Sequence, residues 1–211
     1  MILVIVSGLP IACGESMNDT MEPDSDQLIG FVPEYIFGYY DYGLVMTEVI
    51  PLEQAIKIFD EGIRLIPGQS WPATEAEIMG AIEQYTTEIK TDPHDANSYL
   101  WQGHAYYRLG QLELAIEDYN GVINLITNHA DAYYVRGNSY REIGLIEKAI
   151  EDYNKVVQHL PGYSFAYYAR AMAYVELGQT TEAIADLEEF IALVEIPEWT
   201  ETVKQWIDNI R

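Results

Sequence analysis

Cysteine and histidine are the side chains in this sequence best suited to chemistry, and there are few of them. The 211-residue chain has one cysteine and four histidines, and the histidines are scattered rather than paired as metal ligands usually are. Only His129 and His159 could approach each other, across a turn, and a surface role suits them better. The sequence also lacks a phosphate-binding glycine loop and a nucleophile elbow. We therefore expect no catalytic residue, no metal and no cofactor, and predict that the protein is not an enzyme.

The single cysteine, Cys13, has a more specific setting. The apolar run Ile2–Ala12 precedes it and an acidic stretch follows it. The run is too short to span a bilayer, but it suits the apolar region of a secretory signal. A small residue before a cysteine, with a polar tether behind it, resembles a bacterial lipoprotein signal. This resemblance implies that residues 1–12 are a signal peptide, that Cys13 is lipidated, and that residues 13–34 tether an exported, membrane-anchored protein.

Two features depart from that signal. No lysine or arginine precedes the apolar run, and Pro10 occupies the position where a leucine is expected. The alternative is that Ile2–Ala12 is a strand or helix packed on the rest of a cytoplasmic protein.

The charge balance narrows the range of partners. Asp and Glu number 34 against 11 Lys and Arg, which gives a net charge of -23. Such a surface repels phosphate backbones, so nucleic acid is not expected as a partner.

The elements that position side chains along this chain follow a period of 34 residues between Ala96 and about Ile196. Small and aromatic residues keep their register, and the spacing of the first three sets, by four and three, places them on one helix face. A glycine then ends each first helix. The aligned sets are Tyr99, Tyr133 and Tyr167; Gly103, Gly137 and Ala171; Tyr106, Tyr140 and Tyr174; Gly110, Gly144 and Gly178; Ala115, Ala149 and Ala183; and Tyr119, Tyr153 and Leu187.

This pattern resembles the tetratricopeptide repeat, TPR. The resemblance implies an all-α fold, a right-handed superhelical solenoid of antiparallel helix pairs, with repeats at 96–129, 130–163 and 164–196. Residues 197–211 keep the register but place Gln205 and Asp208 at packing positions, which indicates a C-terminal capping helix.

The register fades upstream, in residues 35–95. Residues from about Tyr35 to Pro67 have the spacing of one degenerate repeat. Alternatively, Leu52–Ile66 and Glu75–Lys90 form one irregular hairpin.

Charged residues also recur at an offset of 18, from the second helix of one repeat to the first helix of the next. We predict that these residues are in contact and link neighbouring repeats. The pairs are Asp118 with Arg136, Asp152 with Arg170, Asp186 with Lys204, and Gln84 with Gln102.

The resemblance also indicates which face of the first helices lines a concave groove. We predict that this groove binds an extended peptide or a partner helix, although packing within the repeats is an equally good explanation for each tyrosine. Asn138 alone matches the residues with which carboxylate-clamp TPR proteins hold a peptide C-terminus, so that ligand is not expected. The predicted groove residues are Asn97, Leu100, His104, Tyr107, Arg108, Tyr134, Asn138, Arg141, Phe165, Tyr168 and Met172.

The most specific function that the sequence supports is therefore a protein-interaction scaffold. Two alternatives remain: an accessory domain of a secretion or enzyme complex, or an enzyme with an unrecognised site in the N-terminal region. The oligomeric state does not follow from the sequence.

Overall fold

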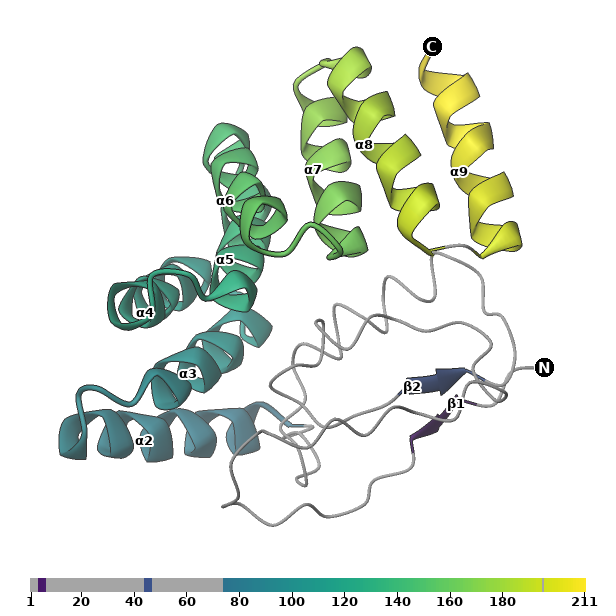
Figure 1. The fold of residues 1–211 in the computed structure, drawn as a ribbon. Coiled ribbons are helices and arrows are strands. Elements are labelled where there is room, and N and C mark those ends of the chain that lie inside the picture. The colour runs from purple at the N-terminus through teal and green to yellow at the C-terminus, as the bar shows by residue number, and fades with distance from the viewer. Residues whose placement is uncertain (1–3, 7–43, 47–73, 195) are drawn as a thin grey trace.

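The chain is described by a computed structural model over residues 4–6, 44–46, 74–194 and 196–211. Within these ranges almost every residue is helical, and successive helices follow an arc from α2 to α9 (Figure 1). The helices are α2 (Glu75–Thr91), α3 (Ala96–Arg108), α4 (Leu112–Leu125), α5 (Ala130–Glu142), α6 (Ile146–His159), α7 (Ser164–Glu176), α8 (Thr180–Val194) and α9 (Pro197–Ile210).

One small sheet accompanies the helices. Strand β1 (Val4–Val6) pairs antiparallel with β2 (Leu44–Met46), with Val4 opposite Met46. β1 lies within the apolar run ahead of Cys13, which is itself outside the described residues. β2 lies where the sequence predicted the first helix of a degenerate repeat, so at these three residues that prediction is wrong. Apolar residues with a central valine suit an extended backbone paired to another valine-rich strand.

Helices α3 to α8 form three antiparallel pairs, α3 with α4, α5 with α6 and α7 with α8, in the solenoid that the sequence predicted. Each pair turns at a glycine in the left-handed region, with φ of 70° at Gly110, 80° at Gly144 and 70° at Gly178. That conformation is strained for residues with a Cβ, so glycine ends the first helix cheaply. Neighbouring pairs then stack, α4 on α5 and α6 on α7.

Side chains at the helix starts satisfy backbone N–H groups that have no partner within the helix. The Asp95 carboxylate accepts from the Asn97 N–H at the start of α3. His129 does the same for α5, where its Nδ1 accepts from the Ala132 N–H. His129 is therefore a helix cap rather than a metal ligand.

The two helices of a pair come closest where a glycine faces a tyrosine ring. A methyl group at Gly103 would lie 2.6 Å from the ring of Tyr119, and one at Gly137 would lie 2.7 Å from the ring of Tyr153. Both rings are fully buried. Because a buried ring has no space into which it can move, any side chain at these glycines would push the helices apart.

The third pair meets the same constraint in a different way. Ala171 occupies the position equivalent to the glycines, and Leu187 replaces the tyrosine. Both are fully buried in the common core. A methyl group on α7 is thus matched by the loss of a ring on α8.

Helix α9 closes the C-terminal end of the array, as the sequence predicted. Its inward side buries Trp199, Val203 and Ile207, and the Trp199 ring packs edge-on against Phe165 of α7. Gln205 lies on the exposed side. This polar outer face covers the last apolar surface and offers none for a further repeat.

Helix α2 packs on α3 at the other end of the described array. Ile78 and Ile82 are buried together with Ala105 in a small second core. The segment Leu52–Ile66, which the sequence suggested as its hairpin partner, lies outside the described residues.

The glycine–tyrosine contact gives a direct test of the packing. We expect Gly137→Ala to lower the free energy of unfolding by about 1–3 kcal/mol, because its methyl group overlaps the Tyr153 ring. The cost should shrink in a Tyr153→Leu background, which reproduces the third pair. Gly80 in α2 is a matched control, because no atom lies within 4 Å of a Cβ there. Gly80→Ala should stabilise the helix by roughly 0.5–1 kcal/mol. Equal effects of both alanines in urea denaturation would contradict the packing.

Candidate protein-binding surface

The predicted groove residues divide sharply by exposure. Four of them are buried: Leu100, His104, Tyr134 and Phe165 are 1%, 2%, 3% and 2% exposed. Asn97 and Arg108 are exposed, whereas the remaining five are half-buried: Tyr107, Asn138, Arg141, Tyr168 and Met172.

The buried aromatic residues of this set pack inside the array. The ring of Tyr134 lies 6.0 Å from that of Tyr153 and 5.2 Å from that of Tyr163. Phe165 lies 5.7 Å from Phe190, measured between ring centroids. For these positions the structure supports packing within and between repeats.

Two further members of the set are partners of the packing tyrosines. The Tyr153 hydroxyl donates to Oδ1 of Asn138 at 2.7 Å, and Nδ1 of His104 lies 3.0 Å from the Tyr119 hydroxyl. In the third pair the equivalent residue is Met172, opposite a leucine that has no hydroxyl to satisfy. Variation at this position therefore follows the chemistry of the neighbouring helix. Without the hydrogen bond, a buried hydroxyl would lose its water partners at a cost of about 1–3 kcal/mol.

A polar row remains at the C-terminal ends of the first helices. The Tyr107 hydroxyl of α3 donates to the Glu142 carboxylate of α5, and Nε of Arg141 lies 3.3 Å from Oε1 of Glu176 on α7. Each contact joins one first helix to the next, and α5 also contacts α7 directly. We call Tyr107, Arg108, Arg141, Glu142 and Glu176 the inner strip.

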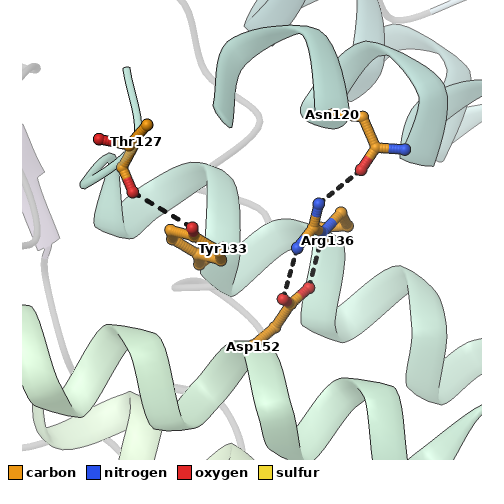
Figure 2. A network of polar contacts seen from close by, with 5 residues as sticks. All are labelled: Asn120, Thr127, Tyr133, Arg136 and Asp152. Atoms are coloured by element: carbon orange, nitrogen blue, oxygen red, sulfur yellow. Dashed lines mark hydrogen bonds and ion pairs between the residues drawn. The ribbon is translucent and has the colours of Figure 1, made fainter. Parts of the chain in front are cut away.

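The strongest polar links of the array lie elsewhere, on arginines between the pairs. Arg136 of α5 donates through Nε and Nη2 to the two carboxylate oxygens of Asp152, at 2.8 and 2.6 Å, and through Nη1 to Oδ1 of Asn120 at 2.5 Å (Figure 2). Its guanidinium also lies 5.4 Å from the centroid of the Tyr133 ring. The Tyr133 hydroxyl donates to the Thr127 carbonyl oxygen in the same view.

The third pair repeats this arrangement. Arg170 donates to both carboxylate oxygens of Asp186 at 2.7 and 2.6 Å and to Oδ1 of Asn154 at 2.6 Å. Each arginine thus holds the aspartate of its own second helix and the asparagine of the preceding one. Although burial opposes the charged form, the hydrogen bonds and charge of Asp152 raise the pKa of Arg136.

The offset-18 contacts predicted from the sequence are therefore wrong. Arg136 and Arg170 take the aspartates 16 residues later, not those 18 residues earlier. Asp186 is held by Arg170 rather than by Lys204, which is exposed. The reason is geometric, because the same offset of 16 that joins glycine to tyrosine within a hairpin also joins arginine to aspartate.

The glutamine pair is wrong for a similar reason. Gln84 donates to the Glu88 carboxylate on its own helix, and Gln102 donates to Oγ1 of Thr86 and the carbonyl oxygen of Ile82. The sequence analysis also missed the asparagines that receive the arginines. Their recurrence as Asn120 and Asn154 was the available signal.

The remaining polar groups do not form a catalytic arrangement. His129 lies at a helix start and burial lowers its pKa, whereas His159 stacks on Tyr133 with 6.4 Å between ring centroids. Burial raises the pKa of Asp131 to about 7. Across residues 74–194 and 196–211, no three His, Cys, Asp or Glu side chains are grouped as metal ligands. None of the helices described has the length and apolarity to cross a bilayer.

Comparison with known proteins agrees with this architecture. Sequence models described as tetratricopeptide repeat match residues 130–163 and 166–193, and one described as TPR repeat matches residues 103–144. No curated protein sequence matches the chain. The chain is therefore a tetratricopeptide repeat protein.

Solved structures share the fold. A crystal structure of MamA is 23% identical with a TM-score of 0.56, over 64% of this chain and 88% of that one. A tetratricopeptide repeat protein from Parabacteroides merdae is 21% identical with a TM-score of 0.58, over 76% of this chain and 58% of that one. The TPR2B domain of yeast Sti1, in a complex with pHsp70, is 20% identical with a TM-score of 0.50, over 55% and 94%.

The arginine contacts give a second test. Arg136→Ala should lower the free energy of unfolding by about 3 kcal/mol, because it leaves Asp152 buried without its partner. In a double-mutant cycle, Arg136→Ala and Asp152→Ala should show a coupling energy within about 0.5–3 kcal/mol. Arg136→Ala and Asp118→Ala should instead be additive within about 0.5 kcal/mol. Strong coupling to Asp118 would restore the offset-18 contact and contradict the structure.

Proposed function

We propose that this protein is an interaction scaffold that binds a peptide or partner helix across the first helices α3, α5 and α7. The TPR architecture carries this proposal, because stacked helix pairs present successive first helices as one extended surface. The TPR2B domain of yeast Sti1, which has the same fold, is known in a complex with pHsp70.

The contact residues of this proposal are the inner strip together with Asn97, Asn138, Tyr168 and Met172. These residues combine aromatic and apolar area with a few polar anchors, which suits an extended or helical ligand. Two arginines of the inner strip, Arg108 and Arg141, offer positive charge on a chain of net charge -23. They would favour a partner with acidic side chains near its apolar contacts.

Burial changes which substitutions can test the surface. Tyr134 lies between two other tyrosine rings, so Tyr134→Ala would damage the core and say little about binding. Arg108 is exposed and Arg141 half-exposed, so their substitution leaves the helix packing intact.

Site-specific photo-crosslinking separates the two faces of the array. A photoreactive amino acid at Arg108 or Arg141 should capture a saturable protein adduct in the native host. The same probe at Glu117 or Glu151, exposed residues of the second helices, should not. Arg141→Glu should weaken capture by the probe at Arg108 without changing the melting temperature, because it reverses charge on the surface. Equal capture from both faces, or no effect of Arg141→Glu, would remove the inner strip as the binding surface.

The second candidate function, an accessory domain of a secretion or enzyme complex, uses the same surface. Mass spectrometry of the adduct distinguishes the two: one constant partner with enzymatic or transport activity favours an accessory domain, and several unrelated partners favour a general scaffold.

We also propose that the scaffold is exported and anchored through Cys13. The sequence supports this through the apolar run before the cysteine and the acidic stretch after it. Expressed in a bacterium that processes lipoproteins and fed radiolabelled palmitate, the full chain should be labelled. Cys13→Ala should not be labelled. Absence of label from the unmodified chain would overturn the anchor while leaving the scaffold intact.

A further inference from the structure

The first helix pair keeps the aspartate of the arginine site but lacks the arginine. In the second and third pairs, Asp152 and Asp186 each receive two hydrogen bonds from a guanidinium. Asp118 is the equivalent residue of the first pair, and Gln102 stands where the arginine would be.

Gln102 does not replace the missing guanidinium. Its amide nitrogen donates to Oγ1 of Thr86 at 2.6 Å and to the carbonyl oxygen of Ile82 at 3.2 Å, both on α2. Its hydrogen bonds therefore tie α3 to α2. Asp118 remains 9% exposed, and its Oδ2 atom is buried without a hydrogen-bond partner.

The groups that surround this carboxylate do not compensate its charge. On its own helix Glu117 adds negative charge, and on α3 Asp118 raises the pKa of Tyr106 together with burial and Glu117. The cation nearest in register is Arg136 of α5, which is held by Asp152 and Asn120. Burial, followed by Glu117, raises the pKa of Asp118 to about 7.

We propose that the first repeat is a pH-sensitive joint, in which proton uptake by Asp118 stabilises the packing of α3 and α4, and proton loss loosens it. A buried carboxylate with no partner carries a large desolvation penalty when charged and a small one when neutral. The second and third repeats lack this response, because guanidinium groups offset the charge of their aspartates.

The sign and size follow from linkage between folding and protonation. The carboxyl binds its proton more tightly in the folded joint than in the opened chain, so stability is greatest at low pH and declines as pH rises toward and through 7. With a folded pKa of about 7, the equilibrium constant for opening this joint should be about tenfold larger at pH 8 than at pH 6.

Hydrogen exchange of the full chain at pH 6 and pH 8, corrected for intrinsic exchange rates, measures this opening helix by helix. Amides of α3 and α4 should lose about tenfold protection at pH 8. Asp118→Asn should remove the difference, because the amide carries no charge. Glu151→Gln is the matched control, since it removes one charge from an exposed position and should preserve the difference.

A gain-of-contact variant provides the converse. Gln102→Arg supplies the guanidinium that the other repeats have, so protection of α3 and α4 should become independent of pH. Asp131→Asn separates the contribution of the other carboxyl with a raised pKa, which lies on α5. An unchanged pH response in Asp118→Asn, or a response of equal size in α7 and α8 of the native chain, would overturn the proposal.

Carbon-13 NMR titration of the native chain covers the case in which a variant does not fold. A midpoint near pH 7 for the Asp118 carboxyl carbon supports the joint. A midpoint below pH 5 overturns it.

Discussion

The close approach of two helices at a glycine facing a buried tyrosine is the contact on which the array depends. Because the Gly137 position has no side chain, the Tyr153 ring can lie directly against the backbone of the facing helix. The position of that ring then places its hydroxyl on Asn138, one residue further along. One contact thus determines the distance between the helices and the residue type beside it.

Stacking of one pair on the next depends on a different chemistry. Arg136 connects three helices, because it lies on α5 and bonds to Asn120 of α4 and Asp152 of α6. A planar guanidinium with five N–H donors can satisfy two acceptors in fixed directions, which lysine cannot do. Apolar packing holds each pair together, and the arginines fix the angle at which pairs meet.

The 34-residue period was enough to predict the helix pairs, the glycine turns and the C-terminal cap, because these depend on local backbone preference and on which face is apolar. It was insufficient for the polar contacts. Arg136 has an aspartate 18 residues before it and another 16 residues after it, and periodicity cannot choose between them. The choice follows from the antiparallel register within a hairpin, which the pairing of glycine with tyrosine already contained.

The groove was overestimated for a related reason. Residues such as His104 and Asn138 vary between repeats, and variation beside constant packing positions suggested ligand contacts. The structure shows that they vary with the tyrosine or leucine opposite. Exposure within a curved stack depends on neighbouring repeats, so a pattern within one repeat could not separate Tyr134, which is buried, from Arg141, which is not.

The uniform junction between pairs also bears on how such a chain can change its length. The second and third pairs present the same acceptor on one side and the same arginine on the other, as Asn120 with Arg136 and Asn154 with Arg170. A duplicated 34-residue segment inserted between them would meet a matching partner at both borders. Gene duplication could therefore lengthen the array internally without new contacts, whereas the polar face of α9 prevents growth at the C-terminal end.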